Sequence, residues 1–341
     1  MIQTKTFTES PISRLNSFLS RISGVNPGNI KPLTPDASTR EYFRIGWENS
    51  TAIACVYPEP LAWQEQSYLD VTNLFVAAGL PVAEIYEFSG EDGVIVHEDF
   101  GDQILRPVLD KVSERERDDW LNQAIVLIAE IQAATPLAEE LGSIAARLAF
   151  DFSKLSWELD FFTTHYFETF RSEKLSGVDA LNLKKELDEV ARELETRISV
   201  LCHRDFHAAN LMIDRENRLR IIDHQDARMG AASYDLVSLL LDRIDQPPTT
   251  AWITRKQQFF LNERNKLNLP KIDAAEFAAE FRLQTVQRCL KAIGTFSYQT
   301  AVRGKTGYAQ FIAPMFAAVL QAAEELNRFP NLQNIIKKQI K

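Results

Sequence analysis

The sequence predicts an α+β fold with two lobes, a small antiparallel sheet with one inserted helix followed by a larger, mostly helical lobe. The chain has 341 residues, which exceeds the roughly 250–300 residues over which one hydrophobic core usually grows. Runs of β character lie before residue 100, whereas helical spacing of apolar residues dominates from residue 107 onward. Hydrophobic residues make up 45% of the chain and charged residues 25%, as in ordinary globular proteins.

The first lobe is predicted to begin with a helix and to continue as strands. Ser10 and Pro11 start the helix, because serine caps the first turn and proline needs no N–H there. Gly24 is the expected end of this helix. A hairpin, an inserted helix and two further strands are expected at 40–46 with 51–57, at 61–78, and at 82–88 with 94–98. Gly101 marks the expected boundary between the lobes.

The second lobe is predicted to be helical with one β-rich interruption. Helices are expected at 118–134, 151–171 and 183–198, and from 234 to the end. Three short strands are expected at 199–202, 211–213 and 219–222, with a turn at 214–217. The aromatic residues of 151–171 are expected to be mostly core residues.

Composition and charge exclude several classes of protein. Acidic residues outnumber basic ones, 47 to 38, and the net charge of −9 disfavours a nucleic-acid-binding protein. The three cysteines form no C-x-x-C pair, which predicts neither a disulfide framework nor a zinc site. The N-terminus lacks the apolar core of a signal peptide, and the apolar runs fall short of the about 18 residues that span a membrane. The sequence therefore predicts a cytoplasmic protein with no membrane partner.

The most informative segment is His203–Asn210, which reads His-Arg-Asp-Phe-His-Ala-Ala-Asn and is followed by Asp223 at the end of a predicted strand. Its first part matches the H-R-D-x-x-x-x-N catalytic loop of phosphoryl-transfer enzymes. In that pattern Asp205 accepts the hydroxyl proton, while Asn210 and Asp223 hold Mg²⁺ for ATP. We expect these three side chains to converge at one edge of the strands. The alternative is a polar loop in which Asp205 and His207 only cap a helix.

These residue types suit the chemistry of ATP. Mg²⁺ takes oxygen ligands and keeps several waters, so one carboxylate and one amide suffice. A transferring phosphoryl group needs charge neutralisation and alignment more than covalent help. A carboxylate beside the acceptor hydroxyl orients it and takes its proton.

The spacing after the motif indicates a small acceptor. Only eleven residues separate Asp223 from Asp235. The activation segment with which a protein kinase holds its peptide substrate needs more room, so a small-molecule acceptor is predicted. Asp235 is expected to be structural, because a carboxylate stabilises a helix N-terminus. Arg204 is also expected to be structural, and Asp226 either pairs with Arg204 or approaches the metal.

His207 gives the loop the form H-x-D-x-H-x-x-N, and with it the segment resembles the aminoglycoside-phosphotransferase-like branch of the protein-kinase-like fold. The stretch Ile-Asp-His-Gln-Asp-Ala at 222–227 and the stretch 234–240 resemble bacterial kinases that phosphorylate the anomeric hydroxyl of N-acetylmuramate and N-acetylglucosamine. Three further stretches are similar to that family's first hairpin, interlobe hinge and a late helix, at 36–44, 98–102 and 287–294.

The resemblance implies ATP and Mg²⁺ as co-substrate and cofactor, and a role in cell-wall sugar recycling. It implies a nucleotide-binding lobe at 1–100 and a catalytic and acceptor-binding lobe at 101–341. Glu98 and Phe100 would lie at the hinge, where backbone groups meet the adenine edge. No pattern in the sequence specifies an oligomeric state.

Two parts of the general kinase pattern are missing. The first hairpin carries no glycine-rich loop, and the strand 51–57 has no lysine. Backbone N–H groups around Ser38 are expected to bind phosphate instead, since such groups form anion-binding turns. Arg40 or Arg44 is expected to supply the cation, because guanidinium binds phosphate oxygens well. The alternative is that both arginines are solvated.

Trp157, His165 and Arg288 are the candidate acceptor-binding residues. With Lys291 and Arg303, Arg288 would give a cationic rim for an acidic substrate such as N-acetylmuramate, which has a lactyl carboxylate. A solvated helix face is the alternative. Two rival functions stay open: a kinase of an aminoglycoside or another small metabolite, and a pseudoenzyme that binds nucleotide without transfer.

Overall fold

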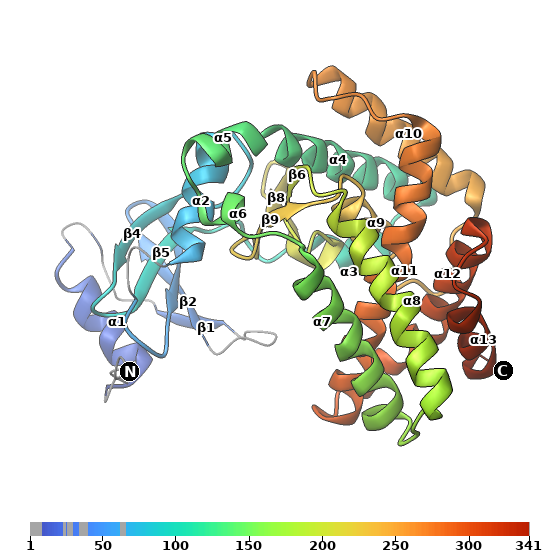
Figure 1. The fold of residues 1–341 in the computed structure, drawn as a ribbon. Coiled ribbons are helices and arrows are strands. Elements are labelled where there is room, and N and C mark those ends of the chain that lie inside the picture. The colour runs from blue at the N-terminus through green and yellow to red at the C-terminus, as the bar shows by residue number, and fades with distance from the viewer. Residues whose placement is uncertain (1–8, 23–24, 26–29, 34–39, 62–65, 341) are drawn as a thin grey trace. The chain divides into compact units, whose positions relative to one another are not determined.

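The computed structural model describes residues 9–22, 25, 30–33, 40–61 and 66–340. The contacts divide the chain into two compact units. The first unit comprises Met1–Val108 and Leu211–Gln225, and the second comprises Leu109–Asn210 and Asp226–Lys341. The predicted α+β class is confirmed, because an antiparallel sheet forms the first unit and helices form most of the second (Figure 1). The functional lobes assigned to 1–100 and 101–341 stay a prediction.

The first unit is built on a five-stranded antiparallel sheet with the strand order β1-β2-β3-β5-β4. The strands are β1 (Lys31–Leu33), β2 (Glu41–Trp47), β3 (Ser50–Val56), β4 (Ile85–Ser89) and β5 (Val94–Glu98). β2 and β3 form the predicted hairpin, with Phe43 opposite Ala54. β5 pairs with both β3 and β4, so the strand that leads to Glu98 lies inside the sheet.

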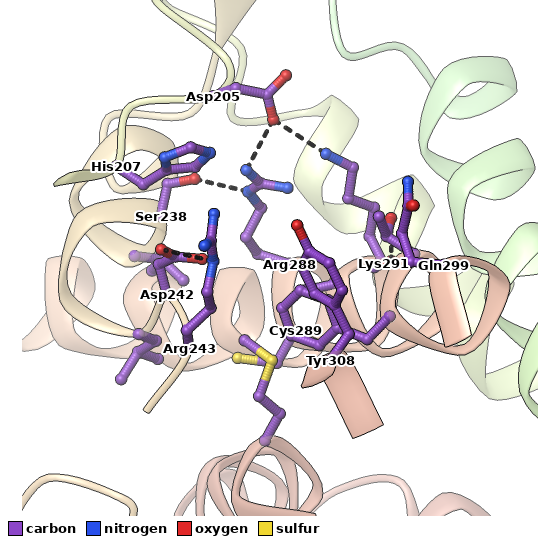
Figure 2. A pocket seen from close by; sticks show the side chains of 16 residues that line it. Asp205, His207, Ser238, Asp242, Arg243, Arg288, Cys289, Lys291, Gln299 and Tyr308 are labelled. Atoms are coloured by element: carbon purple, nitrogen blue, oxygen red, sulfur yellow. Dashed lines mark hydrogen bonds and ion pairs between the residues drawn. The ribbon is translucent and has the colours of Figure 1, made fainter. Parts of the chain in front are cut away.

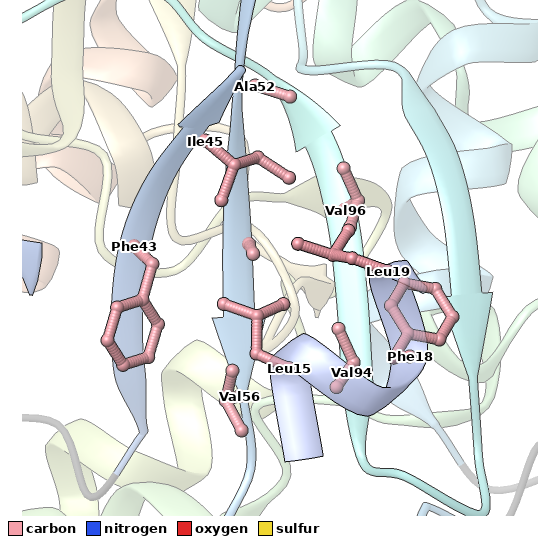
Figure 3. Close-up of a cluster of buried hydrophobic side chains, with 10 residues drawn as sticks. Leu15, Phe18, Leu19, Phe43, Ile45, Ala52, Val56, Val94 and Val96 are labelled. Carbon is pink, nitrogen blue, oxygen red and sulfur yellow. The ribbon is translucent and has the colours of Figure 1, made fainter. Parts of the chain in front are cut away.

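Helix α1 (Pro11–Leu19) covers one face of this sheet (Figure 3). Ser10 caps it as predicted, because its hydroxyl accepts a hydrogen bond from the Ser13 N–H. Apolar side chains of the helix and of three strands form one buried cluster: Leu15, Phe18, Leu19, Phe43, Ile45, Ala52, Ala54, Val56, Val94 and Val96. This burial fixes α1 to the sheet. The helix ends at Leu19, earlier than the predicted end at Gly24, which itself lies outside the described residues.

Two further pieces complete the first unit. The inserted helix is α2 (Ser67–Ala77), and the helix α3 (Leu105–Leu109) follows the sheet. The predicted strands at 211–213 and 219–222 form a hairpin, β7 (Leu211–Ile213) with β8 (Leu219–Ile221). The Ile221 N–H donates to the Pro81 carbonyl over 2.8 Å, and the Ile213 N–H donates to the Gln103 carbonyl over 2.8 Å. These bonds make the hairpin part of the first unit, although it lies far along the chain.

The remaining predicted strand, β6 (Val200–Cys202), belongs to the second unit. It pairs with β9 (Arg228–Gly230), with Leu201 opposite Met229. β9 was not predicted, because three residues reading Arg-Met-Gly have no alternating pattern.

Helices make up most of the second unit. In chain order they are α4 (Glu114–Ala133), α5 (Thr135–Glu140), α6 (Ile144–Arg147), α7 (Phe152–Phe162), the π-helix η2 (Thr163–Phe170), α8 (Gly177–Glu195), the 3₁₀ turn η3 (Ala208–Asn210), α9 (Tyr234–Leu240), α10 (Thr250–Lys266), α11 (Ala274–Ala301), the 3₁₀ helix η4 (Thr306–Phe311), α12 (Ile312–Leu326) and α13 (Pro330–Gln339). The long α11 packs against α7, η2, α9 and α12. It therefore brings distant parts of the unit together.

The predicted helix at 151–171 changes geometry within its length. α7 ends at Phe162, and the next eight residues wind as the π-helix η2. Gly294 of α11 lies directly against this junction, because a Cβ added there would meet Phe162 Cα at 2.7 Å. Only some of the aromatic residues are core residues, which corrects the prediction that most of them are. Phe162, Tyr166 and Phe167 have at most 3% of their surface exposed, whereas the other aromatic residues of 151–171 are half-buried or exposed.

One segment of the described chain, Glu114–Glu140, is long and apolar enough to cross a membrane by length and composition alone. Most of its apolar residues are core residues of the second unit, and Ile125, Ile128 and Ile131 have no exposed surface. Core helices of globular proteins share this composition, so the segment is weak support for a membrane span.

Candidate active site

The loop His203–Asn210 leaves β6 and is fixed by a buried carboxylate of α9. The backbone N–H groups of His203 and Arg204 donate to the two oxygens of Asp235, over 2.7 Å and 3.0 Å. Asp235 has no exposed surface. Burial raises the pKa of its carboxyl to about 7, although the two backbone N–H bonds act in the opposite direction. Asp235 is thus structural, and its contacts hold the loop itself.

Arg204 adopts a left-handed backbone conformation with φ +86°, which non-glycine residues rarely adopt. Its Nη1 lies 2.6 Å from Asp226 Oδ2, and its Nε lies 3.7 Å from Asp205 Oδ2. Of the two positions that the sequence leaves open for Asp226, the structure has the pair with Arg204. Arg204 therefore frames the loop beside Asp205.

Two cations of α11 converge on the Asp205 carboxylate (Figure 2). Arg288 Nη2 donates to Asp205 Oδ1 over 2.9 Å, and Lys291 Nζ donates to the same oxygen over 3.1 Å. Burial alone would raise the pKa of the Asp205 carboxyl, but Lys291, Arg288 and Arg204 outweigh it and hold the pKa well below its usual value. Asp205 is therefore ionised at any pH near neutrality.

Arg288 is buried, with 8% of its surface exposed. Its Nε donates to the Ser238 hydroxyl of α9 over 2.7 Å, and its guanidinium lies 5.5 Å from the centre of the Tyr234 ring. The structure therefore places Arg288 against the loop His203–Asn210, and the contact with Ser238 of α9 orients its guanidinium. Ser238 and Tyr234 were not identified as site residues from the sequence, because nothing local distinguishes them from other residues of an apolar helix.

A pocket of about 170 Å³ opens beside Asp205 (Figure 2). A cavity of this size holds a ring-sized molecule. Its polar lining residues are Asp205, His207, Ser238, Asp242, Arg243, Arg288, Lys291, Thr295, Gln299 and Tyr308. The charged groups among them are two carboxylates and three cations. The pocket thus carries a cationic excess.

His207 lines this pocket with its imidazole. Its Nδ1 is buried without a hydrogen-bond partner among the described residues. Burial is the largest influence on this side chain and lowers the pKa of its imidazole, although Asp242 and Asp205 act in the opposite direction. The ring is therefore neutral near pH 7, and it presents one buried polar atom that a bound molecule can satisfy.

The two predicted metal ligands lie in different units. In the second unit, Asn210 Nδ2 donates to the Asp205 carbonyl over 2.9 Å, which assigns the other end of the amide to oxygen. In the first unit, Asp223 is exposed with φ +64°, and Gln225 Nε2 donates to its Oδ1 over 2.9 Å. Amide and carboxylate oxygens suit Mg²⁺, which needs few protein ligands beside substrate phosphates. In the described part of the chain no three His, Cys, Asp or Glu residues form a metal cluster.

The predicted phosphate-binding residues fall into three situations. Ser38 lies outside the described residues. Arg40 lies 5.7 Å and 5.5 Å from the ring centres of Tyr42 and Tyr57. Arg44 forms a two-pronged pair with Asp99, over 2.7 Å and 3.0 Å, and a second pair with Asp102 over 2.8 Å. The donors of Arg44 are therefore committed to carboxylates of its own unit.

The predicted hinge residues contact an arginine that was not predicted as a site residue. Arg220 of β8 donates to Glu98 Oε2 over 2.6 Å, and its guanidinium lies 4.1 Å from the centre of the Phe100 ring. Phe100 is buried, with 6% exposure. Arg220 thus ties the hairpin β7–β8 to the end of β5. Only the antiparallel register of β7 and β8 brings it there, and no local pattern identifies it.

The two aromatic candidates differ in exposure. Trp157 is 56% exposed on α7, and Lys154 Nζ lies 4.3 Å from its ring centre. His165 lies in the π-helix, 4.1 Å from the ring centre of Phe161 and 5.0 Å from that of Tyr298. Burial lowers the pKa of His165. Their roles in acceptor binding stay predictions.

An antiparallel sheet with an inserted helix, a helical second unit and the loop His203–Asn210 beside a small pocket define a small-molecule kinase with the protein-kinase-like fold. Residues 29–270 match the model of the phosphotransferase enzyme family, and the chain belongs to this family.

Relatives and solved structures support this class. The chain is 27% identical over 304 residues to an N-acetylmuramate/N-acetylglucosamine kinase of Pseudomonas aeruginosa, covering 88% of this chain and 85% of the relative. It is 28% identical over 282 residues to a kinase of the same name from Neisseria meningitidis, covering 80% and 79%. The crystal structure of choline kinase from Cryptosporidium parvum matches with a TM-score of 0.63 at 12% identity, over 96% of this chain and all of that one. The last similarity shows the fold alone.

Proposed function

We propose that the protein transfers the γ-phosphoryl group of ATP to the anomeric hydroxyl of N-acetylmuramate or N-acetylglucosamine. Two relatives that bear this name and cover most of the chain support the acceptor class. The observation that carries the proposal is the cationic excess of the pocket beside Asp205. N-Acetylmuramate has a carboxylate that balances this charge, and N-acetylglucosamine is neutral.

Asp205 orients the acceptor hydroxyl and takes its proton. Oδ1 already accepts hydrogen bonds from Arg288 and Lys291, whereas Oδ2 lies 3.7 Å from Arg204 Nε, which is beyond hydrogen-bond distance. Oδ2 is therefore the oxygen that meets the hydroxyl. A carboxylate with a low pKa is a weak base, but proton transfer occurs late when the transition state is loose, so orientation contributes most.

Asn210 and Asp223 are the residues that would hold Mg²⁺ on the nucleotide. The ion supplies charge neutralisation for the phosphates of ATP. Asn210 presents its amide oxygen because its nitrogen donates to the Asp205 carbonyl. The same hydrogen bond ties the candidate ligand to the loop of the candidate base.

Arg288 and Lys291 give the pocket its selectivity. Both are held against Asp205, and their summed charge exceeds that of the one carboxylate between them. A cationic acceptor such as an aminoglycoside or choline would be repelled by this excess. An anionic or neutral sugar avoids this cost, which favours the amino-sugar proposal over the rival kinases.

The test is an acceptor screen with the purified chain, Mg²⁺ and ATP. Phosphate-resolved NMR of the product, with coupling between phosphorus and the anomeric proton, identifies the modified position. We expect phosphorylation at the anomeric oxygen of both amino sugars and none with choline or aminoglycosides. Transfer to choline or an aminoglycoside alone would overturn the acceptor, and no ADP release with any acceptor despite Mg–ATP binding would support a pseudoenzyme.

A matched pair of variants sharpens the screen. Lys291→Met removes one cation from the pocket, and Lys266→Met removes an exposed cation of α10 with the same change in charge. We expect Lys291→Met to raise KM for N-acetylmuramate more than KM for the neutral sugar. Equal changes in KM for both sugars would show that Lys291 does not recognise the carboxylate of N-acetylmuramate.

A further inference from the structure

His224 directly follows the candidate magnesium ligand Asp223 and is buried in the first unit, with 1% of its surface exposed. Its imidazole stacks against two rings of α2, Tyr68 and Phe75, with centroid distances of 5.3 Å to each. Its Nε2 lies 2.7 Å from Thr72 Oγ1 on the same helix. Residues at i, i+4 and i+7 share one face of a helix, so one face of α2 encloses the side chain of His224.

The direction of the hydrogen bond follows from the contacts of Thr72. Its hydroxyl also contacts the Tyr68 carbonyl over 2.6 Å, and a carbonyl can only accept. The single hydrogen of the hydroxyl is therefore donated to Tyr68, and the oxygen accepts from His224. His224 Nε2 thus carries the hydrogen. Replacing His224 by a residue without an N–H at this position would remove the hydrogen bond that the Thr72 oxygen accepts.

Asp223 lies between two fixed points of the chain. On one side the Ile221 N–H donates to the Pro81 carbonyl over 2.8 Å, and Ile221 forms a parallel bridge with Val82. On the other side His224 is held by α2. The backbone of Asp223 itself has φ +64°, a conformation that non-glycine residues rarely adopt. Such conformations persist where the surrounding structure over-determines them.

We propose that His224 is a positioning residue, which α2 clamps so that the Asp223 carboxylate points where a magnesium–nucleotide complex requires it. The clamp rests on the proposed function, because it needs Asp223 to serve Mg²⁺. In protein kinases a glutamate of the inserted helix pairs with the strand lysine. This chain has no lysine in that strand, and the proposal gives α2 a different role at the nucleotide site. In this chain α2 acts on the nucleotide site through Thr72 and His224, by orienting a carboxylate.

The test measures ATP affinity by titration calorimetry at several Mg²⁺ concentrations, with the full chain. Thr72→Val keeps the shape of the side chain and removes the hydrogen-bond acceptor, whereas Thr72→Ser keeps the hydroxyl. Mg²⁺ should increase the affinity for ATP, and the Mg²⁺ concentration that gives half of this increase is the quantity compared. We expect Thr72→Val to raise this concentration about tenfold, as loss of one buried hydrogen bond of about 1.4 kcal/mol implies. ATP affinity without Mg²⁺ should stay unchanged, and Thr72→Ser should resemble the wild type.

Two further variants separate positioning from general loss of stability. His224→Phe keeps a ring between Tyr68 and Phe75 and removes the N–H, so it should shift Mg²⁺ dependence as Thr72→Val does. Val71→Ala removes buried side chain from the same helix, so it should lower the melting temperature and leave Mg²⁺ dependence unchanged. Binding of Mn²⁺ to the nucleotide complex, followed by electron paramagnetic resonance, should report the same order of variants directly.

Wild-type Mg²⁺ dependence in both Thr72→Val and His224→Phe would overturn the clamp. The same shift in Val71→Ala would overturn it as well, because the effect would then come from stability. If the wild-type chain binds Mg–ATP but phosphorylates no amino sugar, the proposed acceptor is wrong. The clamp is then still tested by the Mg²⁺ dependence of ATP affinity in the variants. A wild-type chain whose ATP affinity ignores Mg²⁺ contradicts both.

Discussion

The candidate base and the carboxylate proposed for the metal are held by different means in the two units. Asp205 is surrounded by charge: two cations of α11 contact one of its oxygens, and the loop around it is fixed by Asp235. Asp223 is exposed, and the structure fixes the backbone on either side of it through Ile221 and His224.

The difference indicates what each residue needs. A group that must stay ionised and orient a hydroxyl benefits from nearby cations, which lower its pKa. A carboxylate that binds a metal ion must instead be oriented toward that ion, and neighbouring cationic side chains would compete with the metal for it. Substitutions that alter charge should therefore act on the Asp205 region, and substitutions that alter packing should act on the Asp223 region.

The largest expected effect tests the charge side of this comparison. Asp205→Asn keeps the shape of the side chain but takes no proton and leaves Arg288 and Lys291 without their counter-charge. We expect the rate of transfer to fall about a thousandfold, within the range for loss of a positioned acid or base. ADP release measures the rate, and calorimetry should show ATP binding largely intact. Asp242→Asn, in the same pocket, is the matched control, and equal losses for both variants would contradict the assignment of the base.

The next effect concerns the loop that carries Asp205. The two oxygens of Asp235 accept hydrogen bonds from the backbone N–H groups of His203 and Arg204. Asp235→Asn replaces one of these oxygens with an NH₂ group, which cannot accept the bond. Loss of one buried partner of this kind costs about 1–3 kcal/mol, which urea unfolding should detect. The pKa of Asp235 is raised to about 7 by burial. Its ionised form therefore costs stability in the folded chain, and this cost grows as pH rises from the usual carboxyl pKa toward 7. The variant should lack this part of the pH dependence; an unchanged slope would contradict it.

A third substitution tests how the cations stabilise Asp205. Lys291→Gln should raise the pKa of the Asp205 carboxyl, because the Lys291 contact lowers it. A depressed pKa contributes stability above the ordinary carboxyl value of about 3.9, and this contribution is lost as pH falls through the folded value. The stability gap to the wild type should thus be about 1–3 kcal/mol at neutral pH and narrow in acid. Lys266→Gln on the surface should show no such trend in urea unfolding, and a gap that widens in acid would contradict the sign.

The smallest expected effect lies in the first unit. Arg44→Lys loses the two-pronged pair with Asp99, whose side chain is 2% exposed, and should cost about 1–2 kcal/mol because an ammonium cannot reproduce that geometry. Since the guanidinium donors are already used, KM for ATP should change little. A large rise in KM with unchanged stability would instead support the phosphate-binding role that the sequence predicts for Arg44.

The parts of this chain that were predictable are those with local patterns. Strand runs joined by turn residues predicted the hairpin β2–β3, helical spacing of apolar residues predicted α4, and a short motif predicted the loop His203–Asn210. Each of these lies where it was predicted. The membership of Leu211–Gln225 in the first unit was not predictable, because it depends on bonds to Pro81 and Gln103.

The same distinction applies to the candidate site. Asp205, Asn210 and Asp223 could be named because their spacing is a motif. Their partners could not, because Arg288 lies 83 positions from Asp205, and Thr72 lies 152 positions from His224. Long-range packing decides such pairs, and a single sequence carries no local trace of it.

Gly294 lies three residues after Lys291 and six after Arg288 on the same rigid helix. A side chain does not fit at this position, because a Cβ would meet Phe162 Cα at 2.7 Å, so α11 packs closely on α7 near the two cations. We expect a methyl group at this position to push α11 away from α7 and, by moving Arg288 and Lys291, to change the pKa of the Asp205 carboxyl, although Gly294 does not line the pocket beside Asp205.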